Sequence, residues 1–351
     1  MASDPRLVTR RTIAGWLAAA LAAAAAIVLA ASDPGPRALA PPGPPVVADL
    51  PDAPGTVDLP PRDERPATPP VALTAADGGR ALVWAERGTG RVLRATLEGT
   101  RVVAPVLVAD LPAVPGASAG VRGIAVDRRG RVLVSFVRRR GRRLVVVALR
   151  DGLRPRTAWV GPRAGRLRVG GGLAALPGGR VVVGIGDQGR LGSAAQPGSL
   201  LGRVVTIDPG GRAGQEPRRR SRGWHDPLAI AADPRGRIWV ADRLGGGDAE
   251  RTGRADRPRL PTVRSPFRRA PIALAIAPDS RLLLACGVGS GRVDRTPRRG
   301  VGAGGVPQVL DARCRYGITV VGDEVLVVDD AGAIVPVGTV EELAEADPVD
   351  A

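Results

Sequence analysis

A short pattern recurs along most of this chain: a polar turn with Gly or Asp leads into a charged residue, and a run of Val, Leu or Ile follows. Short Val-rich runs bounded by turn residues are typical of β-strands. The pattern returns at intervals of 43 to 57 residues. Its six instances are Gly78-Gly79-Arg80, Arg129-Gly130-Arg131, Gly178-Gly179-Arg180, Arg235-Gly236-Arg237, Asp279-Ser280-Arg281 and Gly322-Asp323-Glu324. Repeats of this length that contain only short strands indicate the blades of a β-propeller.

Six instances predict an all-β fold, a six-bladed β-propeller over residues 71–338. The length of 351 residues accommodates one large domain of this kind. The alternative is a β-sandwich whose turns have a similar spacing by chance. We further expect the first strand after residue 70, or the last strands of the chain, to complete a blade shared by both ends.

The first 31 residues predict a membrane segment. Arg6, Arg10 and Arg11 lie in a basic stretch, residues 1–12, and an unbroken apolar run follows over residues 13–31. As a helix this run crosses most of a bilayer. Because basic flanks stay on the cytoplasmic side, we predict a transmembrane signal anchor with a cytoplasmic N-terminus and an extracytoplasmic propeller. The alternative is a cleaved signal that releases a secreted protein.

Two further segments flank the repeats. Residues 32–70 contain 13 prolines and predict an extended, semi-rigid extracytoplasmic linker. Residues 339–351 form an acidic tail, and Thr339-Val340-Glu341-Glu342 at its start is typical of a helix N-cap. The formal net charge of +17 favours anionic partners, although coding bias on a solvated surface explains the same charge. All 51 basic residues are Arg, and no nucleic-acid motif or interleaved aromatics accompany them, so no nucleic-acid partner is predicted.

Two loops with distinctive sequences lie within residues 170–208. Gly186-Asp187-Gln188-Gly189 follows the predicted strand Val181 to Ile185, and Ser199-Leu200-Leu201-Gly202-Arg203 precedes the next strand. These loops resemble the glucose/sorbosone dehydrogenase family, the soluble quinoprotein sugar dehydrogenases that use pyrroloquinoline quinone (PQQ). The resemblance runs from Val71 to about Val337. It implies a six-bladed propeller with PQQ over the channel mouth, a calcium ion that polarises the quinone, and a histidine that takes the proton of a sugar hydroxyl.

The resemblance also indicates where the catalytic residues lie. Counted back from Asp187, the family's histidine falls on Arg168. A guanidinium stays protonated at physiological pH and accepts no proton. Our catalytic candidates are therefore Arg168, Asp187 and His225, with His225, the only histidine, as a relocated base. The alternative for His225 is a histidine packed beside Trp224.

Cofactor contacts follow from the resemblance as well. Gln188 lies in the matched loop, and Asp226 falls where the family has an asparagine that contacts the cofactor; an acid there would repel the carboxylates of PQQ. Asp311-Ala312-Arg313-Cys314-Arg315 resembles the family's Arg-x-Arg clamp, and alternate strand residues share a side, so Arg313 and Arg315 are expected to grip one anion. A chance Arg-x-Arg in an Arg-rich chain is the alternative. The family's cofactor lysine has no counterpart.

Two further sites complete the predictions. Gly245, Asp248 and Glu250 follow a predicted strand and supply oxygens suited to calcium, with a solvated turn as the alternative. Cys286 and Cys314 lie in the fifth and sixth repeats, which are neighbours in a closed propeller. In an oxidising compartment they predict a disulfide, with two buried thiols as the alternative.

The sequence therefore leaves two functional hypotheses. The first is a membrane-anchored, extracytoplasmic oxidoreductase of the PQQ-dependent sugar dehydrogenase type. The second is a catalytically inactive propeller that binds an anionic ligand or a protein at the channel mouth. In both, we expect Arg168, Asp187, His225, Arg313 and Arg315 to converge at the mouth. Such a cationic site favours a carboxylate or phosphate over a neutral sugar.

Overall fold

A computed structural model describes most of the chain from residue 70 onward. The described residues are 70–114, 120–149, 155–243, 250–258, 263–265, 270–277, 282–297 and 307–348. Every described residue belongs to one compact unit. The predicted membrane segment, residues 13–31, lies outside the described residues. Among the described residues, no helix has the length and apolar character of a membrane span.

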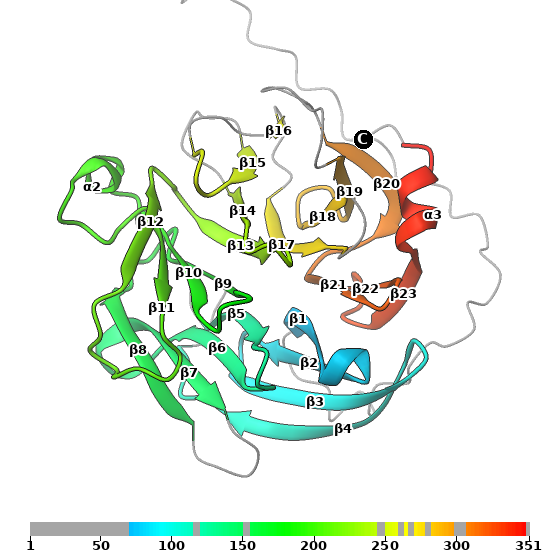
Figure 1. The fold of residues 1–351 in the computed structure, drawn as a ribbon, viewed down its shortest axis with the longest axis horizontal. Coiled ribbons are helices and arrows are strands. Elements are labelled where there is room, and N and C mark those ends of the chain that lie inside the picture. Colours follow the sequence, from blue (N-terminus) through cyan, green and yellow to red (C-terminus); the bar gives the residue numbers. More distant parts are fainter. Residues whose placement is uncertain are drawn as a thin grey trace, which may run out of the picture. The chain divides into compact units, whose positions relative to one another are not determined.

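The described strands form six antiparallel sheets, and every sheet consists of consecutive strands (Figure 1). In chain order the sheets are β1 (Pro70–Ala76), β2 (Ala81–Glu86), β3 (Arg91–Glu98) and β4 (Arg101–Asp110); β5 (Val121–Val126), β6 (Val132–Val137), β7 (Arg143–Leu149) and β8 (Arg156–Arg163); β9 (Gly170–Ala175), β10 (Val181–Ile185), β11 (Arg203–Ile207) and β12 (Arg218–Arg222); β13 (Pro227–Ala232), β14 (Ile238–Asp242), β15 (Glu250–Arg254) and β16 (Val263–Ser265); β17 (Pro271–Ile276), β18 (Leu282–Gly287), β19 (Arg292–Pro297) and β20 (Gln308–Arg313); and β21 (Gly317–Val321), β22 (Glu324–Val328) and β23 (Ile334–Thr339).

The six sheets are the blades of a propeller. The first strand of each blade contacts the first strand of the next, in the order β1, β5, β9, β13, β17 and β21, and β21 contacts β1 again. Figure 1 shows the blades following one another around a common centre, from cyan through green and yellow to red. The inner strands enclose a channel cavity of about 250 Å³ lined mainly by Ala, Val, Leu and Ile. The predicted all-β, six-bladed fold is confirmed.

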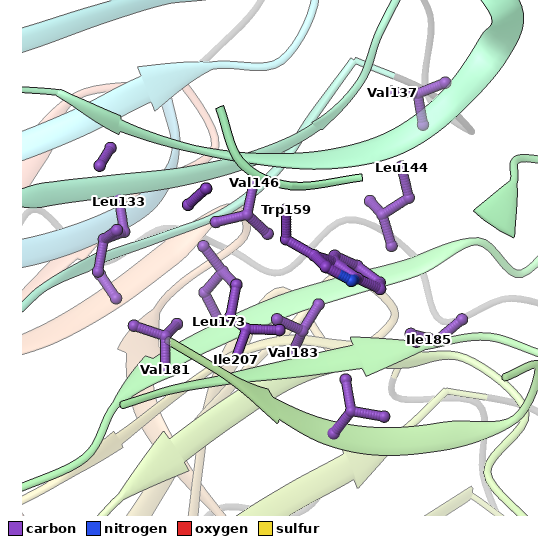
Figure 2. Packing of buried hydrophobic residues seen from close by; sticks show 14 of the residues in the cluster. Leu133, Val137, Leu144, Val146, Trp159, Leu173, Val181, Val183, Ile185 and Ile207 are labelled. Atoms are coloured by element: carbon purple, nitrogen blue, oxygen red, sulfur yellow. The ribbon is translucent and has the colours of Figure 1, made fainter. Parts of the chain in front are cut away.

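One cluster of buried apolar side chains fills each interface between neighbouring blades. Between the second and third blades, Leu133, Val146 and Trp159 pack against Val183 and Ile207 (Figure 2). The strand β10 is buried at all of its residues and is apolar on both faces, because neighbouring blades cover its sheet on both sides, as in stacked sheets. The interfaces therefore take the place of a single central core.

All six recurring turns lie between the first and second strands of a blade, and five of them fall among the described residues. Two have the same internal geometry, built on Asp127 and Asp233. Asp233 Oδ1 accepts hydrogen bonds from the backbone N–H groups of Arg235 and Arg237 at 3.0 and 2.9 Å, and its Oδ2 accepts one from Arg237 Nε at 2.5 Å. Gly236, at φ 76°, makes the left-handed bend that the turn requires. In the second and fourth blades, the repeat detected in the sequence therefore corresponds to a buried aspartate that closes a hairpin.

The expectation of a shared blade is wrong for the described strands, because β1 pairs within the first blade and the last blade has three strands of its own. Apolar packing joins the two ends of the ring instead: Leu73 and Trp84 of the first blade pack against Leu326 and Ile334 of the last. Helix α3 (Val340–Glu345) then follows β23.

The helix α3 begins as its sequence indicates. Thr339 and Glu342 form a reciprocal capping box, with the Thr339 hydroxyl accepting from Glu342 N at 3.1 Å and Glu342 Oε2 accepting from Thr339 N at 2.7 Å. Arg295 of the fifth blade donates to the carbonyls of Leu343 and Ala344, at 2.8 and 2.6 Å. The predicted N-cap is confirmed, and the helix ties the end of the chain to the fifth blade.

The two cysteines lie at the same interface. Cys286, in β18, and Cys314, between β20 and β21, form a disulfide. Both residues belong to the apolar cluster between the fifth and sixth blades. The bond therefore links neighbouring blades at the point where the sixth blade begins.

We predict that Asp233→Asn lowers the free energy of unfolding by about 1–2 kcal/mol at neutral pH. Hydrogen bonds from Arg237 and Arg235 hold the pKa of Asp233 below its usual value, against the opposing effect of burial. The ionised carboxylate therefore stabilises the fold above about pH 4, and this contribution is lost as pH falls through the folded-state pKa. Urea unfolding at pH 7 and at about pH 3 should show the difference between the proteins shrinking at low pH.

The control for this experiment is Asp256→Asn, because Asp256 pairs with Arg254 in an exposed ion pair in which the Asp256 side chain is 57% exposed. Exposed pairs contribute little, so we expect almost no change at either pH. An equal loss of stability in both variants would contradict the structural role of the buried turn aspartate.

Candidate functional site

The candidate site lies at one end of the propeller, which we call the mouth. There the first residues of the inner strands meet the turns that join the second and third strands. Hydrogen bonds connect these segments: Val121 N donates to Arg87 O at 3.4 Å, and Asp187 N donates to His225 O at 2.8 Å. The first four blades each place at least one charged side chain here.

A hydrogen-bonded pair of Asp187 and His225 joins the third and fourth blades. Asp187 is fully buried in the loop after β10, and its Oδ1 accepts the N–H of Gly189 at 2.7 Å. Its Oδ2 lies 2.7 Å from His225 Nδ1. An ionised carboxylate only accepts hydrogen bonds, so Nδ1 carries the proton and the lone pair of the neutral ring is on Nε2. His225 thus makes a hydrogen bond that packing beside Trp224 alone does not account for.

Arg168 shares the same carboxylate. It precedes β9 in a left-handed conformation, φ 48°, and its Nη1 lies 3.4 Å from Asp187 Oδ2. The guanidinium and the imidazole therefore approach one oxygen from adjacent blades. Of the five residues expected at the mouth, the structure brings Arg168, Asp187 and His225 into contact.

Arg313 and Arg315 are placed differently. Arg313 is exposed at the end of β20, and Arg315 lies 3.6 Å from Asp330 with 45% of its side chain exposed. Among the described contacts, neither touches Arg168, Asp187 or His225. Arg315 does stack over Tyr316, at 5.9 Å from the ring centre, and so belongs to the rim of the mouth on the sixth blade.

Asp226 links three blades. Its Oδ1 accepts the N–H of Gly170 at 2.8 Å, and Arg122 Nη2 approaches the same atom at 3.8 Å. Its Oδ2 accepts hydrogen bonds from Arg243 Nε and Nη2 at 3.1 and 2.8 Å. The side chains of Asp226 and Arg122 are each 1% exposed. The carboxylate that was expected to repel an anionic cofactor is therefore neutralised by two arginines.

Arg87 adds a third guanidinium to this cluster. Burial, together with the nearby charges of Arg122 and Arg243, lowers the pKa of Arg87 to about 9, and Asp226 only partly opposes this effect. Burial also lowers the pKa of Arg122. Within the described residues, the buried Nε of Arg87 has no hydrogen-bond partner. At neutral pH the cluster holds three cations around one carboxylate, and a buried polar group without a partner is a binding opportunity for an anion.

A second buried carboxylate, Asp242, fixes the peptide that carries the site. Its Oδ1 accepts the backbone N–H groups of His225 and Asp226 at 2.9 and 2.7 Å. Its Oδ2 accepts Arg251 Nη2 at 3.0 Å, and Arg251 stacks 4.7 Å above the ring of Trp224. Burial raises the pKa of Asp242, while the Arg251 ion pair and the backbone N–H groups lower it. Asp242 thus acts as a positioning residue for both His225 and Asp226.

The side chains of the remaining predicted ligands make other contacts, although the backbone N–H of Gln188 donates to Arg168 O at 3.2 Å. Gln188 donates from Nε2 to the carbonyl of Arg163 at 2.6 Å. Glu250 is buried, and its Oε2 accepts the N–H of Ala270 at 2.9 Å. Gly245 and Asp248 lie outside the described residues. No group of three or more His, Cys, Asp or Glu side chains suited to a metal occurs in the described part, so the calcium site stays a prediction.

Arg87, Arg122 and Arg243 were not predicted from the sequence. Arg122 is the second residue of an otherwise apolar inner strand, and a lone charge there is the signal that marks it. Arg87 and Arg243 each follow directly after a second strand, where the repeat places a turn at the mouth. With 51 arginines in the chain, these positions did not stand out.

We predict that Asp226→Asn destabilises the protein by about 3–5 kcal/mol, because it leaves the buried guanidinium groups without their carboxylate. Citrate is an anion and should restore part of the lost stability by binding the positive charge that Asp226 no longer compensates. Thermal unfolding with and without citrate measures this effect. The control Asp330→Asn removes only the exposed partner of Arg315 and should change stability by less than about 1 kcal/mol. No citrate effect specific to Asp226→Asn would argue against an anion-accepting cluster.

No protein-family model matches the chain, and no curated protein matches it in sequence. Solved structures do match. The chain is similar to the PQQ-bound aldose sugar dehydrogenase of Streptomyces coelicolor, with 19% identity and a TM-score of 0.63 over 77% of this chain and 94% of the other. It is similar to the apo-form of the soluble aldose sugar dehydrogenase of Escherichia coli, with 16% identity and a TM-score of 0.56 over 77% and 95%.

A different kind of protein has a similar fold. A chain of a nidogen/laminin complex matches with 17% identity and a TM-score of 0.50 over 71% of this chain and 84% of the other. At these identities the likeness concerns the fold. The chain has the propeller architecture found in the aldose sugar dehydrogenases, as its loops predicted.

Proposed function

We propose that this protein is an oxidoreductase of the PQQ-dependent sugar dehydrogenase type, with His225 as the proton acceptor. The hydrogen bond between Asp187 and His225 at the mouth carries the proposal. It orients an imidazole beside a cluster of buried arginines, on a fold shared with aldose sugar dehydrogenases. A base oriented by a buried carboxylate is the arrangement that general base catalysis requires.

The cluster fits an anionic cofactor such as PQQ, which carries carboxylates. Arg87, Arg122 and Arg243 supply more positive charge than Asp226 neutralises, and the buried Nε of Arg87 lacks a partner within the described residues. These three residues would hold the carboxylates through charge-assisted hydrogen bonds. When bound, the quinone supplies an acceptor for the two electrons and the hydrogen that leave the sugar carbon.

The chain itself supplies the proton transfer. His225 Nε2 takes the proton of the sugar hydroxyl, while Nδ1 keeps its hydrogen bond to Asp187. The Asp187 carboxylate stabilises the imidazolium that forms, as in other His–Asp pairs. Asp242 holds the backbone of His225 in place. Arg168 lies against the same oxygen of Asp187 and is suited to contact an oxygen of the substrate rather than to act as a base.

The predicted location agrees with the disulfide. Structural disulfides persist mainly in oxidising compartments, and Cys286 and Cys314 form one here. We therefore propose that the propeller is extracytoplasmic and held at the membrane by residues 13–31, with release after signal cleavage as the alternative. Calcium is proposed on the family resemblance alone.

A second candidate function is ligand binding without catalysis. Arg168 stands where the resembled enzymes have a histidine, and the cluster around Arg87 would bind a carboxylate or phosphate in either case. A chain of a nidogen/laminin complex has a similar fold, so propellers of this kind are not confined to the dehydrogenases. A measurement of sugar oxidation therefore distinguishes the enzyme from the binding protein.

We predict that the full chain reduces an artificial dye with aldoses after addition of PQQ and calcium, and that His225→Gln lowers kcat about 100-fold or more. The affinity for PQQ, measured by absorbance titration, should change less than about threefold. Asp187→Asn should shift the pH profile of kcat as well as lower it, since it alters the group that orients the ring. Tight PQQ binding with no turnover by the wild type would favour the second function.

A separate test concerns the arginine cluster. Arg87→Gln should weaken PQQ binding at least about tenfold, because it removes a guanidinium whose buried Nε has no hydrogen-bond partner among the described residues. Arg166→Gln removes the same charge from an exposed position before Arg168 and should leave the affinity within about twofold. Equal affinity in both variants would show that PQQ, if it binds, uses other residues.

A further inference from the structure

A second cationic site lies at the end of the propeller remote from the mouth. Three connections meet there: the turn between β5 and β6, the turn between β9 and β10, and the segment that follows β11. Together they line a cavity of about 520 Å³ between the second and third blades. The charged side chains in its lining are Asp127, Arg128, Arg129, Arg131, Arg180 and Asp208.

The walls of this cavity are held rigidly. Asp127 Oδ1 accepts the N–H groups of Arg129 and Arg131 at 2.9 and 3.0 Å, and its Oδ2 accepts Arg131 Nε at 2.7 Å. On the other side, Asp208 N donates to Gln215 Oε1 at 2.9 Å, and Gln215 Nε2 reaches Ala158 O of the second blade at 2.8 Å. The two sides are therefore joined across the blade interface, and the cavity is built before any ligand arrives.

The charge of the cavity is not balanced by the protein. Asp127 is bound by Arg131, whereas Arg128, Arg129 and Arg180 form no ion pair with a carboxylate among the described residues. The excess of positive charge extends outward along β12, where burial, and after it the nearby charges of Arg218 and Arg180, lowers the pKa of Arg220. Like charges gathered around a cavity repel one another, and an anion between them relieves that repulsion.

The lining also leaves room for a ligand. A Cβ atom added to Gly178 or Gly179 would meet nothing within 4 Å, and neither would one added to Gly130. The backbone of both turns therefore faces open space rather than a neighbouring side chain. Guanidinium groups offer several N–H donors in a planar fork, which matches the oxygens of a phosphate group better than those of a neutral ligand.

We propose that this cavity binds an anionic ligand with more than one phosphate group. The mouth is formed by the opposite ends of β5 and β9, so the site is separate from the one assigned to catalysis. The phosphate groups come either from a soluble polyphosphate compound or from anionic lipid headgroups. Both sources present the same chemistry to Arg129 and Arg180.

The test is calorimetric titration of the full chain with sodium tripolyphosphate at about 0.15 M salt, where exposed charges are largely screened. We expect saturable binding that Arg129→Gln/Arg180→Gln weakens at least about tenfold. The matched control is Arg139→Gln/Arg140→Gln, which removes two exposed arginines from the β6–β7 turn of the same blade, at the mouth end. It should stay within about twofold, and an equal loss in both double variants would overturn the proposal.

Two further experiments test where the phosphate groups bind and whether they come from a lipid. Arg87→Gln should leave the cavity's binding intact, and loss of all binding in that variant would place the phosphate at the mouth and overturn the proposal. Sedimentation with phosphatidylglycerol vesicles identifies a lipid source if Arg129→Gln/Arg180→Gln reduces binding about tenfold. Binding of both tripolyphosphate and vesicles that is insensitive to these two arginines would refute the site.

Discussion

The mouth of this propeller depends on the carboxylate of Asp226. It receives Gly170 N from the third blade, Arg243 from the fourth and the charge of Arg122 from the second. Burying ions is unfavourable unless their hydrogen bonds are satisfied, so this arrangement is stable only when all three blades are in register. A second buried carboxylate, that of Asp242, accepts hydrogen bonds from the backbone N–H groups of His225 and Asp226 and so fixes their positions. The site is therefore assembled by contacts between neighbouring blades and does not exist within any single blade.

The fold was predictable because its signals are local. Hairpin turns such as the one at Asp233 and Gly236 join the first two strands of a blade, and they are fixed by residues four positions apart or fewer. Ring closure has no such local signal. Packing of Leu73 and Trp84 against Leu326 joins residues about 250 positions apart, and many apolar strands would pack equally well by pattern alone. The expectation of a shared blade failed for this reason.

The site was predictable in part. Residues marked by local sequence motifs were found, whereas residues that depend on contacts between blades were missed. The loops carrying Asp187 and His225 were found because they contain distinctive short motifs. Arg122 and Arg87 were missed because what makes them notable is burial beside other cations, which depends on contacts between blades. Arg313 was predicted at the mouth, but it is exposed at the end of β20. Alternate residues of a strand share a side, yet the sequence does not say whether that side faces the mouth.

The carboxylate of Asp187 is contacted from two blades, by Arg168 and by His225. In a propeller, loops of neighbouring blades project into one mouth, so a carboxylate at the end of β10 is reachable from the segment before β9 and from the segment before β13. An imidazole is useful as a base wherever it meets that carboxylate, because the hydrogen bond to Nδ1 sets the tautomer and the ring orientation. Under the proposed function, His225 of the adjacent blade therefore takes the role of the histidine that the resembled family has at the position of Arg168. The guanidinium that replaces it adds a cation beside the reacting group, where it favours an electron-rich or anionic substrate over a neutral one.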